Sequence, residues 1–584
     1  MCGISGVFTY AGAAADLQPG VMATLASMRA RGPDGEGVWN SPDRTVCLGH
    51  RRLSIIDLSN GGSQPMDSAD GRVTLVFNGE IYNYRSLRRE LEADGAVFRS
   101  DSDTEVLLAL YQRHGRDMLG RLRGMFAFAL WDGERQGMLL ARDGFGIKPL
   151  YLADDGKTLR VASQVKALLA GGGIDTSPEP AGHAGFYLWG HVPEPFTLYR
   201  GIRALAPGQW LWQERGRAAQ SGRFFDLSAE LASIPADGSI DLAQALRDSV
   251  AHHMIADVPV GVFLSAGLDS SLLTALASQV SAPVDTLTLG FSDFAGTAND
   301  EVPLAELTAA HYHTRHSTIR VPKEDFAAAR ADILAAMDQP SIDGVNVWLV
   351  SRAAAQRGLK VALSGLGGDE LFAGYGSFGQ LPRLAGALAP LAAVPMLGKG
   401  FRLATQGWLS RFTSPKWAGL LEYGSSLGGA YLLRRGLFMP WELPQVLDPH
   451  MAREGWARLH TETQLAQAVA GLGNGRLAVS ALEGGFYMRN QLLRDADWAG
   501  MAHSLEIRVP LVDVELWRSV VSLVKAGKAP SKRDMAHAAM PALPDAVLNR
   551  PKTGFHVPID RWMGHSSLRG WARSVHKEFC RGAA

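Results

Sequence analysis

Between residues 258 and 365 the chain alternates apolar strands with helices, and this alternation restricts its fold more than any other feature. The expected strands are 258–265, 285–291 and 359–365, and the expected helices end at Gln279, run from about Val302 to His313 and run from Val347 to Gln356. Apolar strands separated by helices are typical of a parallel sheet covered on both faces. This part is therefore predicted to be α/β, with a mainly helical remainder from about residue 380.

The first 170 or so residues follow a different pattern. Short apolar runs bounded by turn residues predict strands at 45–50, 73–80, 124–132 and 137–143. Helical apolar spacing runs from Tyr84 to Asp94 and from Thr104 to His114. This mixture predicts layered α+β packing.

The amino-acid composition changes again at 215–239, where glycine, serine and alanine become frequent and no hydrophobic periodicity persists. We predict a linker there, between a domain over 2–214 and a domain over 240–584. The length of 584 residues is consistent with two to four domains of about 150 residues.

Composition excludes several classes of protein. Hydrophobic residues make up 46% and charged residues 20%, which excludes a disordered chain. Lys+Arg and Asp+Glu number 58 each, so the overall basic charge of a nucleic-acid-binding protein is missing. Three cysteines are too few for a disulfide framework and the N-terminus lacks the pattern of a secretory signal, so a cytoplasmic location is expected.

The longest uncharged apolar run lies between Arg383 and Lys399, contains two prolines and is too short to cross a membrane. No membrane span is therefore predicted, and contact with a membrane surface stays open. Cys580, close to the end of the chain, is predicted to lie in a mobile tail.

Two segments that follow predicted strands have the features of a phosphate site. The strand ending at Leu264 leads into Ser265–Ser271, where small residues let the backbone turn and a helix begins at about Ser270. Free N–H groups and the helix dipole favour an anion there, although this segment alone fits an ordinary helix cap equally well. A second strand leads into Ser364–Glu370 in the same way. Ligands bind at this edge of parallel sheets, and Asp269 and Asp369 could both reach an Mg²⁺ ion held by phosphates.

These segments resemble the PP-loop ATP pyrophosphatases, whose signature is SGGxDS. Ala266 stands at the second position of that signature here. Alanine keeps the loop tight, so we expect the loop to work with this change.

The first half has a cysteine at position 2. Removal of Met1 would leave Cys2 with a free α-amino group, which can act as a base beside the thiol. The start MCGI is followed, in order, by Arg31–Gly35, Gly49–Ser54, Phe77–Asn83 and Ser102–Glu105. Together these segments closely resemble class II glutamine amidotransferases, which implies an N-terminal-nucleophile hydrolase fold with layered sheets between helices.

The resemblance implies glutamine as the substrate and Cys2 as the residue that becomes a glutamyl thioester. Arg52 can pair with the α-carboxylate of glutamine, and Asp103 and the region of Glu80 can receive its α-ammonium. The side chain of Asn78 and the backbone N–H of Gly79 can stabilise the oxyanion that forms during attack.

An amidotransferase half followed by a PP-loop half is similar to the glutamine-hydrolysing asparagine synthetases. Matching segments at 143–151, 363–375, 504–513 and 550–555 extend the resemblance over most of the chain. It implies an ATP site made of Leu264, Ser265, Gly267, Asp269, Ser270, Leu289, Ser364 and Gly365, with Mg²⁺ held by Asp269 and Asp369. Lys552 would neutralise the α-phosphate while an acceptor carboxylate becomes an acyl-adenylate, and ammonia would arrive through an internal tunnel.

The acceptor stays open between alternatives. Aspartate, giving asparagine, is the default for this family, but Leu366 and Trp498 depart from its usual residues around the expected acceptor pocket. Those departures resemble a branch thought to amidate other carboxylates, such as sugar acids in polysaccharide biosynthesis. A free-standing glutaminase, a non-catalytic scaffold and a β-lactam synthetase-like cyclase are the rival functions, and Cys2 counts against the last. Small molecules are the expected partners, nucleic acid is not, and a homodimer is an open alternative.

Overall fold

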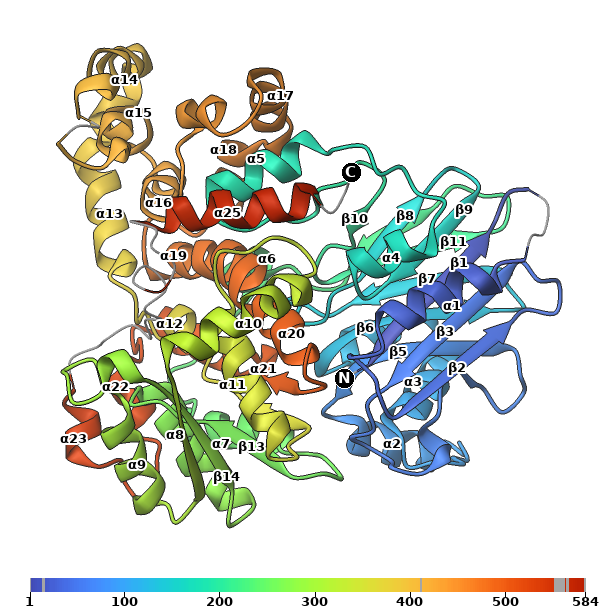
Figure 1. The fold of residues 1–584 in the computed structure, drawn as a ribbon. Helices are drawn as coiled ribbons and strands as arrows, with labels where there is room; N and C mark the ends of the chain where they lie inside the picture. The colour runs from blue at the N-terminus through green and yellow to red at the C-terminus, as the bar shows by residue number, and fades with distance from the viewer. Residues whose placement is uncertain (1, 13–15, 410–411, 551–561, 563–566, 582–584) are drawn as a thin grey trace.

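The computed structural model describes residues 2–12, 16–409, 412–550, 562 and 567–581. Within these residues the chain forms three β-sheets, two built from residues up to Arg223 and one in the second half (Figure 1). The N-terminal sheets lie on one side of the molecule, and the third sheet and most helices lie on the other (Figure 1).

Both N-terminal sheets are antiparallel. The first has the order β10-β8-β9-β1-β3-β2 and the second the order β12-β11-β7-β6-β5-β4. Strands of the first sheet are β1 (Gly3–Thr9), β2 (Gly35–Asn40), β3 (Val46–Arg52), β8 (Tyr151–Asp154), β9 (Thr158–Ala162) and β10 (Arg203–Ala204). Strands of the second are β4 (Met66–Asp67), β5 (Val73–Ile81), β6 (Gly124–Asp132), β7 (Gly137–Arg142), β11 (Gln209–Glu214) and β12 (Gln220–Arg223).

The two sheets pack face to face between helices. Ile4, Leu48, Val76 and Leu140 belong to one buried cluster that joins the facing sides of the sheets. Helices α1 (Gln18–Ser27) and α4 (Val165–Gly171) cover the first sheet, and α2 (Tyr84–Ala93) and α3 (Asp103–His114) cover the second. This helix–sheet–sheet–helix arrangement confirms the predicted layered α+β fold.

The third sheet is parallel throughout and has the order β15-β14-β13-β16-β17. Its strands are β13 (Val260–Phe263), β14 (Asp285–Phe291), β15 (Arg315–Val321), β16 (Val361–Leu363) and β17 (Glu506–Arg508). Helices α7 (Leu242–His253), α8 (Leu268–Val280), α9 (Val302–His311) and α11 (Val345–Gln356) surround it (Figure 1). The predicted α/β fold is therefore confirmed, and β17 joins the sheet from a segment far along the chain.

The segment predicted as a linker contains regular structure. Its residues 220–223 form β12, which pairs with β11, and α6 (Leu227–Ser233) begins after the cap residue Asp226. Neither element was predicted from the sequence. Strand β12 is a polar edge strand, and only Leu227 and Leu231 of α6 are buried, so neither gives a clear apolar pattern. The domain limits themselves stay a prediction.

The remaining helices include the predicted helical C-terminal part. They are α5 (Pro180–Trp189), α10 (Lys323–Ala336), α12 (Gly368–Leu371), α13 (Ser377–Leu388), α14 (Pro395–Leu409), α15 (Leu420–Tyr423), α16 (Leu427–Arg435), α17 (Pro449–Leu459), α18 (Thr461–Ala468), α19 (Arg476–Leu482), α20 (Arg494–Met501), α21 (Val514–Lys525), α22 (Lys532–Ala536), α23 (Asp545–Leu548) and α25 (Leu568–Arg581). A π-helical segment, Glu483–Leu493, connects α19 to α20. Cys580 lies on α25, so its predicted place in a mobile tail is wrong; α25 is held by the buried side chains of Trp571, Ala572 and Val575.

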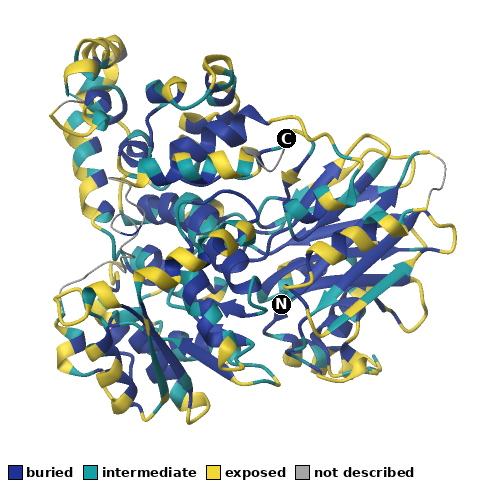
Figure 2. Cartoon of the chain, in the orientation of Figure 1, coloured by how far each residue is buried: buried dark blue, intermediate teal, exposed yellow. Residues whose placement is uncertain are grey.

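No single helix among the described residues has both the length and the apolarity needed to cross a membrane. One pair of helical segments, Ser377–Ala393 and Met396–Leu409, is long and apolar enough only when the two are counted together. The chain bends by 110° between these two segments. Figure 2 shows that this pair, at the upper left, carries many exposed residues.

Candidate active sites

Cys2 lies just before β1 and is buried among the ends of both N-terminal sheets. Its backbone nitrogen donates a hydrogen bond to Oδ1 of Asn78 at 3.0 Å. Its carbonyl oxygen accepts a hydrogen bond from Nε of Arg31 at 3.1 Å. Burial raises the pKa of the Cys2 thiol, so a thiolate there requires a base or donor to assist its formation.

Asn78 and Gly79 are consecutive residues of β5. Asn78 is fully buried, and its Nδ2 has no hydrogen-bond partner among the described residues. A side chain at Gly79 would bring a Cβ within 2.1 Å of the Met125 carbonyl oxygen, so only glycine fits against β6. An unpaired buried donor next to Cys2 is available for an oxyanion.

Arg52 ends β3. Because Gly3 of β1 is paired with Arg51, the next step of that register places Arg52 beside Cys2. The Arg52 guanidinium donates to the carbonyl oxygens of Ser59, at 2.8 Å, and Asp57. A loop therefore holds this cation at the end of β3.

Asp103 and Glu80 are both buried acids. Asp103 begins α3, and its Oδ2 accepts a hydrogen bond from the Ile81 N–H at 2.9 Å. Burial raises the pKa of Asp103 to about 6. Oε1 of Glu80 lies 3.5 Å from Nη2 of Arg508, so this side chain faces the other half of the protein.

The eight residues predicted to bind ATP line one cavity of about 280 Å³ at the carboxyl ends of the parallel strands. They are Leu264, Ser265, Gly267, Asp269, Ser270, Leu289, Ser364 and Gly365. Helix α8 begins at Leu268, so its first turn points N–H groups at this cavity. Oγ of Ser270 accepts a hydrogen bond from the Ser265 N–H at 3.1 Å, and Oγ of Ser265 accepts one from the Gly267 N–H at 3.2 Å.

Asp269, on the wall of this cavity, is connected to Asp369 through a lysine that the sequence did not single out. Nζ of Lys532 forms an ion pair with Asp269 and lies 3.0 Å from Oδ1 of Asp369. Lys532 is in α22, and its position in sequence gives no sign of this contact. Two carboxylates that converge on one cation offer the all-oxygen donor set that Mg²⁺ prefers.

At two positions, Leu366 and Trp498, the sequence departs from the usual residues of the family that it resembles. Leu366 lines the nucleotide cavity, and Trp498 is absent from its wall. Nε1 of Trp498 donates to Oδ1 of Asp495 at 2.7 Å, and the other oxygen of Asp495 accepts from Ser341 at 2.8 Å and Gln491 at 3.0 Å. Trp498 thus belongs to a buried polar network with Asp495, Ser341 and Gln491.

The two sites are joined by a short series of contacts. Ala496 lines the nucleotide cavity, and the guanidinium of Arg31 donates to both oxygens of Asp497 at 2.7 and 3.0 Å. Arg31 also binds the Cys2 carbonyl, so one buried ion pair connects the nucleophile region with the wall of the other site. Lys552 lies outside the described residues.

Glu370 follows the candidate metal ligand Asp369 and gives a pH-dependent prediction. Burial and the neighbouring carboxylate raise the pKa of Glu370 from its ordinary 4.5 to about 7. Because the folded protein holds this proton more tightly than the unfolded chain, wild-type stability falls as the pH rises from about 4.5 to about 7. Glutamine stays neutral and can still accept the hydrogen bond from Tyr375.

We therefore expect Glu370→Gln to stabilise the protein by about 1–3 kcal/mol at pH 8 and to have little effect at pH 4.5. Thermal unfolding of both proteins at the two pH values measures the difference. A stability difference that does not change with pH would contradict the raised pKa of Glu370.

Two family models match the chain. The glutamine amidotransferase domain matches residues 1–224, and asparagine synthase matches residues 241–578. A putative glutamine-hydrolysing asparagine synthetase from Mycobacterium tuberculosis is 36% identical, with 98% of this chain and 90% of the relative covered. Glutamine-hydrolysing asparagine synthetase 1 from Bacillus subtilis is 32% identical, with 99% and 90% covered.

More distant similarities were also found. An amidase, chyE, from Penicillium rubens is 30% identical over 65% of this chain and 60% of the relative. The solved structure of glutamine phosphoribosylpyrophosphate amidotransferase from B. subtilis is 18% identical, covers 54% of this chain and 65% of its own, and has a TM-score of 0.30, too low to support a conclusion. The two family models and the nearly full-length relatives show that this chain belongs to the glutamine-hydrolysing asparagine synthetase family of ATP-using carbon–nitrogen ligases.

Proposed function

We propose that Cys2 hydrolyses glutamine and that the ammonia released amidates a carboxylate activated by ATP in the second half of the chain. The observation that carries this proposal is the contact series from Cys2 through Arg31 and Asp497 to the wall of the nucleotide cavity. It supports two chemistries that work in one protein rather than a glutaminase alone.

In the first half, the Cys2 sulfur attacks the side-chain amide of glutamine. Removal of Met1 turns the Cys2 backbone nitrogen into the α-amine, which Asn78 already holds through Oδ1 and which takes the thiol proton. Nδ2 of Asn78 and the N–H of Gly79 donate to the oxyanion. The tetrahedral intermediate collapses to a thioester as ammonia leaves, and water then releases glutamate.

Two charged side chains, Arg52 and Asp103, are proposed to orient glutamine in this site. Arg52 binds the α-carboxylate of glutamine, exchanging its contacts with the carbonyl groups of Asp57 and Ser59 for a stronger charged pair. Asp103 receives the α-ammonium, together with backbone near Glu80. The charged substrate group would lower the pKa of the buried Asp103 carboxyl.

In the second half, ATP lies over the strand ends with its phosphates at the first turn of α8. The acceptor carboxylate attacks the α-phosphate, pyrophosphate leaves, and ammonia displaces AMP from the acyl-adenylate. Asp269 and Asp369, which converge on one point, would hold Mg²⁺, which when bound neutralises phosphate charge. Lys532 would then turn from the two carboxylates to the phosphates, and Lys552 is assigned to the α-phosphate.

The acceptor is the finer part of the proposal. Aspartate is favoured by relatives named asparagine synthetase, whereas a different carboxylate is favoured by Leu366, because leucine on the cavity wall can neither bind a cation nor move a proton. The test is mass spectrometry of products after incubation with ATP, Mg²⁺, glutamine and a panel of carboxylates that includes aspartate and sugar acids. A carboxamide on one candidate identifies the acceptor, and glutamate without any ATP-dependent product would overturn the synthetase function.

Replacing Leu366 tests whether this position selects the acceptor. We expect Leu366→Glu to shift the ratio of kcat/KM between acceptors by about tenfold or more, because it adds a charge to the cavity wall. Competition between paired acceptors, with ATP–pyrophosphate exchange as the readout, measures the ratio. An unchanged ratio in an active variant would remove Leu366 as the cause of acceptor choice.

A further inference from the structure

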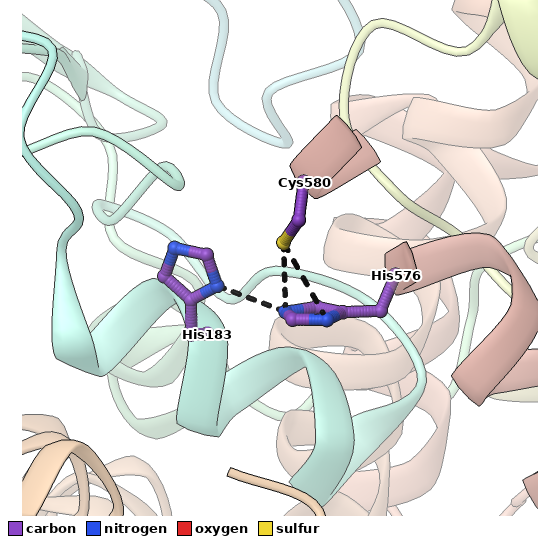
Figure 3. Close-up of side chains that lie close together, drawn as sticks. All are labelled: His183, His576 and Cys580. Atoms are coloured by element: carbon purple, nitrogen blue, oxygen red, sulfur yellow. Dashed lines mark hydrogen bonds between the residues drawn. The ribbon is translucent and has the colours of Figure 1, made fainter. Parts of the chain in front are cut away.

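Two histidines and a cysteine lie together on the side of the molecule away from both candidate sites. His183 is on α5, and His576 and Cys580 are one turn apart on α25 (Figure 3). Nδ1 of His183 is 2.9 Å from Nε2 of His576, and Sγ of Cys580 is 3.8 Å from that same nitrogen. The three donor atoms all lie within 4.8 Å of one another.

These distances suit one tetrahedral ion. Zinc bonds of about 2.0–2.1 Å to nitrogen and about 2.3 Å to sulfur place ligand atoms roughly 3.3–3.7 Å apart around the metal. The helices therefore need to shift little to bring all three atoms onto one ion. Imidazole and thiolate are donors that zinc prefers, and the fourth position faces solvent because Cys580 is exposed.

The surroundings also fix the ligands. His183 is buried, and its ring hydrogen-bonds to the backbone of Leu198, the kind of contact that orients metal-binding histidines. His576 packs against the rings of Phe186 and Tyr187. The spacing of His576 and Cys580 puts both side chains on the same face of α25.

We propose that these three residues bind a zinc ion, with water as the fourth ligand. The ion would join residues 393 positions apart and fasten α25 to α5. Helix α25 follows the stretch of chain that carries Lys552, so the ion would anchor the far end of that stretch. This site is separate from the proposed amidotransferase chemistry and does not depend on it.

Cobalt titration of the chelator-treated full chain tests the site, because Co²⁺ bound to a thiolate gives a charge-transfer band. We expect one band in the wild type, removed by competing Zn²⁺ and lost in Cys580→Ser. His183→Gln should weaken binding by at least about tenfold. Cys2→Ala and Cys47→Ala exclude the other two thiols, and His450→Gln, on the exposed side of α17, is the matched histidine control; all three should keep the band.

Zinc should also raise the unfolding temperature of the wild type and not that of Cys580→Ser. It should protect Cys580 from alkylation. Absence of the band in the wild type, or its survival in Cys580→Ser, would overturn the proposal.

Helix α14 carries a second, independent signal, because its apolar side faces away from the protein. The side that packs inward contains Gly398, Arg402 and Gln406, with Gly398 against the backbone of Glu422 and Arg402 paired with the Glu422 carboxylate. The outward side chains include Met396, Leu397, Leu403 and Trp408. A helix on the surface of a globular protein normally buries its apolar side. Helix α14 does the reverse, because its apolar side is exposed and the opposite side packs against the protein.

Neighbouring segments continue this apolar surface. Phe412 is 75% exposed and Trp417 is 52% exposed, and Met396 and Trp408 on α14 are 73% and 61% exposed. Between Glu370 and Glu422 the sequence has no acidic residue, and two of its basic residues, Arg383 on α13 and Lys399 on α14, are exposed. An apolar surface with exposed basic side chains beside it matches an anionic lipid headgroup layer.

We further propose that α14 and the adjoining Phe412 and Trp417 rest on the surface of an anionic phospholipid bilayer. The 15 residues of α14 are too few to span a bilayer, so the helix would lie along the interface, with tryptophan at headgroup depth. The bend of 110° between the two helices lets α14 lie flat while α13 connects it to the enzyme.

Co-sedimentation with vesicles of phosphatidylcholine and phosphatidylglycerol tests this surface against vesicles of phosphatidylcholine alone. We expect the wild type to bind the anionic vesicles, less at high salt, and the double variant Leu403→Glu/Trp408→Glu to bind at least about tenfold more weakly. Val97→Glu, at an exposed apolar residue of the N-terminal half, is the control and should bind as the wild type does. Unchanged ATP–pyrophosphate exchange, the activity assigned to the half that carries α14, shows that the double variant is folded.

Wild-type protein that ignores anionic vesicles would overturn the proposal. So would a dimer that dissociates in the double variant while neither protein binds vesicles, because a second copy would then cover this face.

Discussion

Replacing Cys2 with alanine is expected to abolish glutamine-dependent amidation and to leave ammonia-dependent amidation close to the wild-type rate. The loss should be about 10³-fold or more, because no other described group can form the thioester. Externally added ammonia bypasses the first site and reacts at the acyl-adenylate. The asymmetry of the two effects is the main consequence of dividing the chemistry between two halves.

The measurement is amide formation with either nitrogen source at saturating ATP and acceptor. Cys47→Ala is the matched control, because Cys47 is a buried thiol of β3 that the proposal does not use, and both activities should survive it. Mass spectrometry of the intact protein should show that Met1 is removed. Loss of both activities in Cys2→Ala, with the protein still folded, would contradict the division of labour.

Much of this arrangement could be predicted where the sequence signal is local. The strands at 73–80 and 285–291 were found because β5 and β14 are buried almost throughout and are bounded by turn residues. Loop Ser265–Ser271 was found because small residues follow a strand end and precede a helix. Each of these features is specified within about ten neighbouring residues.

The features that the sequence did not predict depend on distant residues. Lys532 meets Asp269 although 263 positions separate them, and Arg31 meets Asp497 across 466 positions. Strand β17 has only three residues, and its apolar content alone would not distinguish it from a loop. Tertiary packing decides these contacts, and no local periodicity reports them.

The orientation of α14 is another feature that the sequence could not predict. The apolar run between Arg383 and Lys399 reaches only the first residues of α14, and periodicity cannot say which side of a helix meets the protein. The packing of Gly398 against Glu422 settles that orientation. A strongly apolar helix can therefore leave its apolar side uncovered, and only the structure reveals it.

The second large effect is expected at Asp369. Asp369→Asn should reduce ATP-dependent amidation by about 10²–10³-fold with either nitrogen source, while glutamine hydrolysis by Cys2 continues. Asparagine keeps the size of the side chain but removes the charge that would hold Mg²⁺ and that now pairs with Lys532. Cys2→Ala thus removes glutamine hydrolysis and spares the ATP-dependent step, whereas Asp369→Asn does the reverse.

ATP–pyrophosphate exchange with the acceptor measures the loss directly, and glutamate release measures the first half. Asp325→Asn, at an exposed position in the first turn of α10, changes charge equally in the same half and should leave both rates unchanged. Raising the Mg²⁺ concentration should partly restore exchange in Asp369→Asn, because Asp269 keeps its share of the site. Equal loss of glutaminase and exchange activities would mean that Asp369 supports the whole structure, and full exchange activity would remove it from the metal site.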